Sequence, residues 1–357
     1  MPETLLTAEI AGILFLSIRS GRPQSPARTS RQGRTMDLWR IGVLLACLVM
    51  PGASLAQENF PSRPVRIVIP YSPGSVADVF ARIVAQNMSA QWNGASIVVE
   101  SKSGANGSIA AEEVARSAPD GYTWFLVTTF FTASPALYNN LRWDPLRDFA
   151  AAGQICRAPN FFIVPTSLPV KTVAEFVALA KAKPGTLNYS HPGKGSTGHL
   201  GFELFKRLAG IDVTGIGYRG YPQMVPDIAS GLITSAFVSA NQALAQVQTG
   251  AIRIIGTIND GRTKYFPEVP TLAEQGFAEA QVTPWFGIVV PAATPRPILE
   301  RISKALDAAL STPDVQEKLD TAGCEPKSAP LSQFADIIKA DVALWAKVVK
   351  EAGITAD

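Results

Sequence analysis

The body of this chain alternates short apolar runs with segments whose apolar residues follow helical spacing. The run VRIVI at 65–69 has the length and composition of a buried strand, and apolar residues at helical spacing follow it over 76–88. A second series begins with FFIV at 161–164, and Thr172 and Glu175 then match a capping box that starts the next helix. Strands that alternate with helices predict parallel βαβ units whose sheets are covered on both faces.

Two such series in one chain predict two lobes. A length of 357 residues also exceeds what one hydrophobic core usually holds together. We therefore expect an α/β fold with one lobe from residues 57–158 plus 284–357, a second lobe from residues 159–283, and a ligand cleft between them. The strands that cross between the lobes, near 157–161 and 282–287, would form the hinge.

Residues 36–56, MDLWRIGVLLACLVMPGASLA, have the pattern of a secretory signal peptide. Arg40 precedes an apolar run, and small residues precede Gln57. The run is too short to span a bilayer, which takes roughly 20 residues. We expect cleavage before Gln57 and export to the periplasm. A lipoprotein anchor on Cys47 is the second interpretation, because the apolar stretch before this cysteine is very short.

Residues 1–35 contain an apolar stretch at 11–18, and the segment that follows it is rich in Arg, Ser and Pro and has no structural pattern. We expect that translation starts at Met36 and that residues 1–35 are not part of the natural protein. The cysteines of the mature chain, Cys156 and Cys324, would face an oxidising compartment. Their sequence leaves two possibilities open, a disulfide or two buried thiols.

The charge pattern argues against a nucleic-acid partner. The net charge is +3, and the six Arg and three acidic residues before residue 57 leave 26 basic and 26 acidic groups in the rest of the chain. A protein that binds nucleic acid needs a surface rich in basic residues. Two His and three Cys without ligand spacing also predict no metal site, and no cofactor motif is found.

Two glycine-containing turns, at 70–78 and 190–199, each follow a strand and precede a helix. Ligands of α/β sheets bind beyond the carboxyl ends of strands. The free N–H groups at the start of a helix attract carboxylate or phosphate, and Ser72, Ser75 and neighbouring hydroxyls add donors. The alternative for each turn taken alone is an ordinary helix cap.

Catalytic patterns are weak. Gly193, Gly195 and Gly198 fit the dinucleotide spacing, but no acidic residue follows at the required distance, so we reject it. Ser196 near His199 is the one candidate pair for an exported serine hydrolase. Two aromatic residues, Phe130 after the third strand and Trp285, are candidate pocket walls, with core packing as the alternative.

Several segments, in order, resemble the Bug family, the receptors of tripartite tricarboxylate transporters. They include FPSRPVRIVIPYSPGSVADVFAR, GTLNYSHPGKGSTGHLGFELFKRLAG and VTPWFGIVVPAATP, and the resemblance covers nearly all of 60–357. It implies the two-lobed Venus-flytrap fold of periplasmic binding proteins, of the type II kind. It also implies binding of a small organic carboxylate by two opposed turns. The ligand-binding residues implied are Tyr71, Ser72, Gly74, Ser75, Val76, Asp78, Thr129, Phe130, Gly195, Ser196, Thr197, His199, Tyr218, Gly220 and Ser239.

The sequence departs from the family pattern in three places. The first turn has Gly74-Ser75 followed by Val76 where a Gly pair is usual, Thr234 stands where an acidic residue is common, and Phe130-Phe131 stands where smaller or polar residues are usual. These departures favour a bulky or apolar carboxylate, and an aromatic acid is one hypothesis. We expect a monomeric binding protein without catalysis that delivers its ligand to membrane transporter subunits. The alternatives are the hydrolase and a protein that presents its ligand to a sensor.

Overall fold

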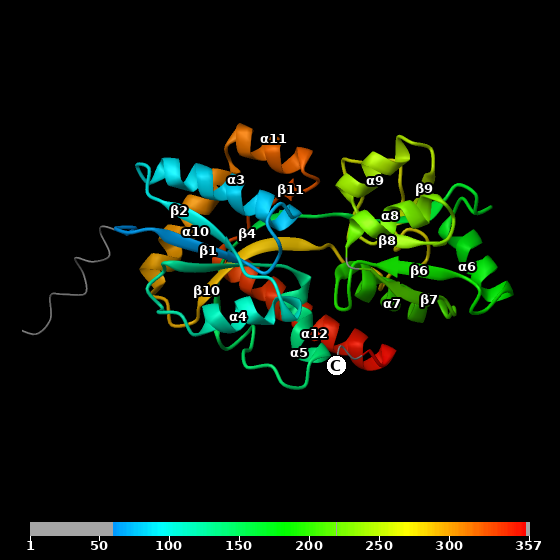
Figure 1. Cartoon of the computed structure of the whole chain (residues 1–357), viewed down its shortest axis with the longest axis horizontal. Helices are drawn as coiled ribbons and strands as arrows, with labels where there is room; N and C mark the ends of the chain where they lie inside the picture. Colours follow the sequence, from blue (N-terminus) through cyan, green and yellow to red (C-terminus); the bar gives the residue numbers. More distant parts are fainter. Residues whose placement is uncertain (1–59, 219, 355–357) are drawn as a thin grey trace, which may run out of the picture. The chain divides into compact units, whose positions relative to one another are not determined.

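The computed structural model describes residues 60–218 and 220–354. They form two β-sheets, each with helices on both faces (Figure 1). The proposed extension 1–35 and signal peptide 36–56 lie outside the described residues. No helix in the described part of the chain is long and apolar enough to cross a membrane.

The first sheet has the strand order β11-β4-β10-β3-β1-β2, and we call it and its helices the first lobe. Its strands are β1 (Val65–Ile69), β2 (Ile97–Ser101), β3 (Thr123–Val127), β4 (Phe149–Arg157), β10 (Trp285–Pro291) and β11 (Glu325–Pro326). Its helices are α3 (Val76–Gln91), the 3-10 turn η1 (Ala105–Gly107), α4 (Ser108–Ala115), α5 (Thr129–Leu137), α10 (Arg296–Leu310), α11 (Pro313–Thr321) and α12 (Leu331–Ala352).

The second sheet has the order β7-β6-β8-β5-β9, and it belongs to the second lobe. Its strands are β5 (Asn160–Pro165), β6 (Asn188–His191), β7 (Thr214–Gly217), β8 (Ala236–Ser239) and β9 (Ile252–Thr257). Its helices are α6 (Val173–Ala182), α7 (Thr197–Ala209), α8 (Tyr221–Ala229) and α9 (Ala240–Val247). The capping box is present, since the Glu175 N–H donates to the Thr172 hydroxyl at 3.1 Å.

The expectation of parallel sheets is only partly right. β1 is parallel to β2 and β3, and β6 is parallel to β7 and β8, but β5 and β10 are antiparallel to both of their neighbours. Each of these two strands enters its sheet just after the chain has crossed from the other lobe. It therefore starts at the edge where the parallel strands end, and it runs in the opposite direction.

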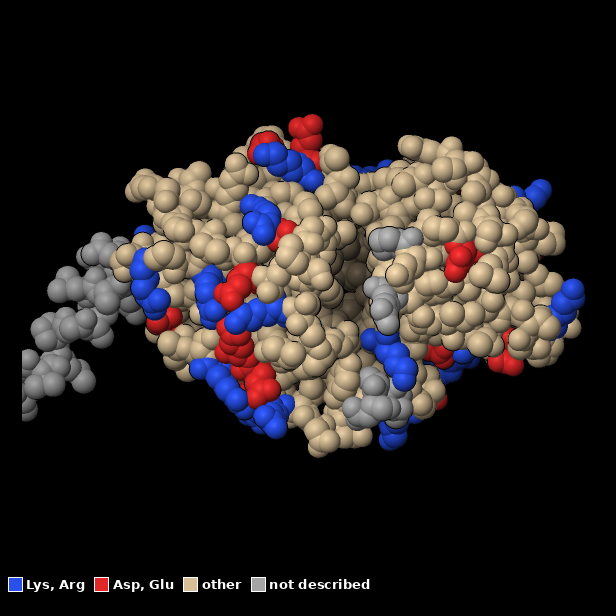
Figure 2. Space-filling view, in the orientation of Figure 1, with Lys and Arg blue, Asp and Glu red and all other residues tan. Residues whose placement is uncertain are grey.

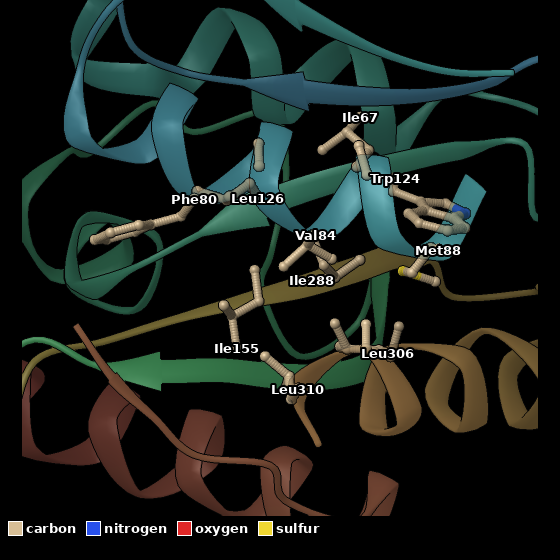
Figure 3. Packing of buried hydrophobic residues seen from close by; sticks show 14 of the residues in the cluster. Ile67, Phe80, Val84, Met88, Trp124, Leu126, Ile155, Ile288, Leu306 and Leu310 are labelled. Atoms are coloured by element: carbon tan, nitrogen blue, oxygen red, sulfur yellow. The ribbon is translucent and has the colours of Figure 1, made fainter. Parts of the chain in front are cut away.

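The alternation of side chains along each strand divides the first lobe into two packed layers. Ile67, Trp124 and Leu126 face α3 and α10, whereas Phe125 and Val127 face the layer of α4, α5 and α12. Figure 3 shows Phe80, Val84 and Met88 of α3 directed at the strands, with Leu306 and Leu310 of α10 beside them. A helix that buries an apolar stripe in this way gains roughly 1.5–3 kcal/mol per large side chain.

Two elements of the first lobe extend into the core of the second. Leu137 of α5 and Trp345 and Val348 of α12 belong to the same buried cluster as Phe162 and Phe205. The division of the chain at 158/159 and 283/284 remains a prediction, and this packing shows that the last turns of α12 also contact the second lobe.

The structure settles the pairing that the sequence left open. Cys156 of β4 and Cys324, next to β11, form a disulfide with their Cα atoms 5.6 Å apart. Both cysteines are fully buried. The bond joins the edge strand β11 to the strand that leads into the second lobe.

Candidate functional site

The first turn lies between the end of β1 and the start of α3. Ser75 caps α3, because its hydroxyl accepts from the Asp78 N–H at 3.3 Å. Asp78 is buried, and its carboxylate accepts from the Gly74 N–H at 2.9 Å and pairs with Arg82 Nε at 2.9 Å. The bonds with Arg82 and Gly74 hold the pKa of Asp78 below its ordinary value. The bond between the Asp78 carboxylate and the Gly74 N–H therefore holds the turn in its shape. Ser72 is exposed.

The second turn lies between β6 and α7, and Ser196 holds it together. The Ser196 hydroxyl donates to the Gly193 carbonyl at 2.7 Å and accepts from the His199 N–H at 3.3 Å. The Gly195 N–H donates to His199 Nδ1 at 3.2 Å. The hydrogen bonds of Ser196 are thus to backbone groups, and His199 Nδ1 faces the turn. This geometry gives no support to the hydrolase alternative.

A pair of buried histidines supports the second turn. The rings of His191 and His199 lie 4.3 Å apart between centroids, and the Gly193 N–H donates to His191 Nδ1 at 3.2 Å. Burial, followed by the proximity of His191, Lys194 and Lys206, lowers the pKa of His199 to about 3. Burial also lowers the pKa of His191. Each Nδ1 accepts a backbone N–H, so both rings are neutral when the turn is formed.

Acidification is therefore expected to destabilise the protein as the pH falls from about 6.5 toward 3. Above pH 6.5, His199 is neutral in both the folded and the unfolded chain, so it contributes no pH dependence. Below that pH the unfolded chain binds the extra proton, and the free energy of unfolding decreases by up to about 1.4 kcal/mol per pH unit for this group. Urea unfolding of wild type and His199→Asn between pH 7 and 4 measures this slope.

The Asn side chain keeps an oxygen near the place of Nδ1 but does not titrate in this range. The variant should therefore lose less stability on acidification than wild type. Equal slopes would show that His199 is not held neutral by the fold.

The second turn contacts the first lobe at three points. The Thr197 hydroxyl, at the first residue of α7, donates to the Thr129 hydroxyl, at the first residue of α5, at 2.9 Å. Asn106 Nδ2 donates to the Lys194 carbonyl at 3.2 Å. A Cβ atom on Gly195 would lie 2.6 Å from Leu137 Cδ1. The N-terminal ends of α5 and α7 therefore meet, and Figure 2 shows the surface hollowed between the lobes.

The first turn contacts the N-terminal end of α5 through an aromatic pair. The Tyr71 ring lies edge-on to Phe130, with centroids 6.0 Å apart, and Phe130 follows Thr129 in the chain. Phe130 is only 5% exposed, and it also packs against Phe125 and Phe131. Most of its ring is thus core, which weakens the argument from this residue for a bulky ligand.

The remaining predicted residues lie around these turns. The Tyr218 N–H donates to the His191 carbonyl at 2.9 Å, and its hydroxyl donates to Asp227 at 2.6 Å. Gly220 precedes α8 with a φ of +149°, and Val76 packs on the core of the first lobe. Ser239 precedes α9, and its hydroxyl donates to Asn241 Oδ1 at 2.6 Å. Whether these residues contact a ligand stays a prediction.

Thr234 was wrongly interpreted as bearing on ligand identity. Its hydroxyl donates to the Asn188 carbonyl, and its N–H donates to Asn188 Oδ1 at 2.7 Å. Asn188 begins β6, whereas the candidate site lies beyond the last residue of that strand, His191. The predicted pocket wall Trp285 is also buried, and its indole N–H donates to Asp341 at 2.7 Å.

Three residues near the site were missed from the sequence. Asn106 has a φ of +48° in η1, which a Gly-rich turn could have suggested. Asn241 lies against Gly323 of the first lobe, since a Cβ on that glycine would be 2.9 Å from the Asn241 nitrogen. Tyr221 begins α8, and its only signal was its place between Gly220 and a proline. Among the described residues, no group of three or more His, Cys, Asp or Glu could hold a metal ion.

Comparison with known proteins decides the family. A family model described as tripartite tricarboxylate transporter family receptor matches residues 80–354. This chain belongs to that receptor family. It is a solute-binding receptor with the two-sheet α/β fold of the periplasmic binding proteins of this family.

Solved structures of similar proteins agree with the assignment. Rpa4515 of R. palustris with adipate is 33% identical, with a TM-score of 0.74 over 83% of this chain and 99% of that one. The periplasmic binding protein BugD is 28% identical, with a TM-score of 0.71 over 83% and 99%. MatC of Rhodopseudomonas palustris with bound malate is 28% identical, with a TM-score of 0.70 over 81% and 100%.

Proposed function

We propose that this receptor binds a small organic carboxylate between its lobes in the periplasm and delivers it to a membrane transporter without catalysis. The observation that carries the proposal is the meeting of α5 and α7 at the Thr129–Thr197 hydrogen bond of 2.9 Å. The N-terminal end of a helix carries a partial positive charge of about half an elementary charge. Two such ends side by side repel each other unless an anion lies between them.

Unused donors at the two helix ends fit the same ligand. The backbone N–H groups of Thr129, Phe130, Thr197 and Gly198 donate to no residue that the structure describes. Each such group needs an acceptor when the lobes close and exclude water. A carboxylate supplies two oxygens with several acceptor positions, and charge-assisted bonds of this kind contribute roughly 1.5–3 kcal/mol each.

The known ligands of similar proteins support the class. Adipate and malate, bound by Rpa4515 and MatC, are both carboxylates. The chain passes from one sheet to the other at 157–161 and at 282–287. The lobes would close by bending at these two segments. Export by the signal peptide, a monomeric state and delivery to a transporter rather than a sensor remain parts of this proposal.

Carboxylates, but not their neutral amides, are expected to stabilise the purified protein against heat. Thermal unfolding is measured with adipate, malate and benzoate, and with adipamide as the neutral control. A ligand at 100 times its Kd adds about 2.7 kcal/mol to stability, so the unfolding temperature should rise clearly.

Thr197→Val is then expected to weaken binding of the best carboxylate by about tenfold in calorimetry, because a hydrogen-bonding group of the site is lost. Thr214→Val, an exposed position on β7, is the matched control and should bind like wild type. No stabilisation by any carboxylate, or equal stabilisation by adipamide, would contradict the proposed function.

A further inference from the structure

One peptide group of the second turn, between Lys194 and Gly195, is bonded on both of its sides. Its N–H, on Gly195, donates to His199 Nδ1 within the second lobe at 3.2 Å. Its carbonyl, on Lys194, accepts from Asn106 Nδ2 of the first lobe at 3.2 Å. The N–H and C=O of a trans peptide point in opposite directions within one plane, so the two bonds together fix the direction in which this group faces. The N–H groups that we propose to meet the carboxylate follow directly, from Thr197 at the start of α7.

The first lobe encloses Gly195 with two side chains. Gly195 is buried although it lies in a turn. A Cβ atom on it would lie 2.6 Å from Leu137 Cδ1 of α5 and 3.4 Å from Asn106 Nδ2 of η1. Leu137 supplies apolar contact, which has no preferred direction, whereas the bond from Asn106 is directional. Of these two side chains, Asn106 is therefore the one that can set the orientation of the turn.

The backbone that presents Asn106 has positive φ angles at four residues in succession. They are +130° at Gly104, +44° at Ala105, +48° at Asn106 and +87° at Gly107. Residues other than glycine adopt such angles at a cost, and Asn tolerates them better than Ala. Costly backbone conformations persist only where surrounding contacts hold them, and they are concentrated at ligand-binding and switch regions.

Contacts within the first lobe hold this turn in place. The Gly107 N–H donates to the Gly104 carbonyl at 2.9 Å. A Cβ atom on Gly107 would lie 2.6 Å from Phe130 Cε2, so the backbone of the turn lies directly on that ring. Phe130 is buried in the core of the first lobe and has little room to move. The first lobe therefore presents the Asn106 side chain to the second turn from a fixed support.

We propose that Asn106 is a positioning residue that locks the second turn onto the first lobe when the receptor closes. This inference rests on the proposed function and adds a residue to it. The bond joins protein to protein, so it stabilises the closed state equally for every ligand. It forms only while the lobes are together, so its loss speeds the release of the ligand and leaves the rate of capture unchanged.

Stopped-flow tryptophan fluorescence tests the lock with those of adipate, malate and benzoate that stabilise the wild type. Asn106→Ala and Asn106→Gly are each expected to raise the dissociation rate constant about three- to tenfold, which corresponds to the loss of one hydrogen bond. The association rate constant should stay that of wild type, and the factor should be the same for each acid. Asn93→Ala is the matched control, because Asn93 is exposed in the turn after α3 and has a φ of +53°. Its dissociation should equal that of wild type.

Hydrogen exchange without added ligand gives a second readout. The amides of residues 193–199 should exchange faster in both Asn106 variants than in wild type and in Asn93→Ala, because the Lys194 carbonyl loses its contact with the first lobe. Asn106→Gly removes the backbone cost at this position together with the side chain. Equal effects of the glycine and alanine variants therefore identify the amide group, and not the backbone, as the part that acts.

The outcomes separate this inference from the proposed function. Unchanged dissociation in either Asn106 variant, or a change in the association rate constant alone, would overturn the lock and leave carboxylate capture standing. A factor that differs between acids would show that Asn106 contacts the ligand itself, which also overturns it. If the wild type binds no carboxylate, the proposed function fails, and the exchange comparison alone decides whether Asn106 holds the turn.

Discussion

Replacing both Cys156 and Cys324 with Ala is expected to lower the free energy of unfolding by about 2–5 kcal/mol. The disulfide spans a sequence separation of 168 residues. A cross-link over so long a segment removes much of the conformational freedom of the unfolded chain, and the entropy model gives a value near the upper end of this range. Guanidinium unfolding of wild type, with and without a reductant, and of the double variant measures the loss.

The same substitution should also weaken ligand binding, because the disulfide holds a contact between the lobes. Asp320, at the end of α11, pairs with Lys264 of the second lobe, and its carbonyl accepts from the Tyr265 hydroxyl at 3.0 Å. Gly323, next to Cys324, lies against Asn241. Without the bond, β11 and the end of α11 lose their covalent link to β4 and keep the pairing of β11 with β4 and the contacts with Lys264 and Tyr265. Identical unfolding curves for oxidised and reduced wild type would show that the cysteines do not stabilise the fold by pairing.

Gly195→Val is expected to weaken ligand binding by at least tenfold. A Cβ at this position would lie 2.6 Å from Leu137 Cδ1, on the opposite lobe. Leu137 is buried in the cluster shared by both lobes, so its side chain has little room to move away from the added atoms. The added side chain would hold the second turn away from α5 and separate the donors that face the ligand.

The φ of Gly195 is +78°, which is also unfavourable for valine, so the backbone cost needs its own control. Gly250 has a φ of +70°, and a Cβ atom added to it would meet no other atom within 4 Å. Gly250→Val should therefore cost similar stability and leave binding unchanged. Calorimetry with the best carboxylate, together with thermal unfolding of both variants, separates the two effects. Equal binding by the two variants would mean that the contact with Leu137 does not control closure.

Much of the local structure could be predicted from short stretches of sequence. The strand at 65–69 and the helix caps at Thr172 and Ser196 follow from apolar periodicity and from side chains that bond to neighbouring backbone groups. These interactions join residues within a few positions, so one sequence contains all their partners. The motif order was also specific enough to indicate the family, which the comparisons confirm.

For other residues the type could be predicted to matter, but the contacts could not. Asp78 is predicted to contact the ligand, and the structure shows that it also shapes the first turn through its bonds with Gly74 and Arg82. Its contact with a ligand stays a prediction. Phe130 follows a strand end, as a pocket residue would, yet the rings around it make it mostly core. In both cases the residue type was informative, and the structure adds the neighbours that the side chain contacts.

The sequence by itself determined the alternation of strands and helices, the two capped turns and the family, because each rests on neighbours in the chain or on the order of motifs. Only the tertiary structure decided the antiparallel direction of β5 and β10, the pairing of Cys156 with Cys324 and the meeting of Thr129 with Thr197. These contacts join segments tens to more than a hundred residues apart. Their geometry is set by how two packed sheets are placed against each other, and no local pattern of residues encodes that placement.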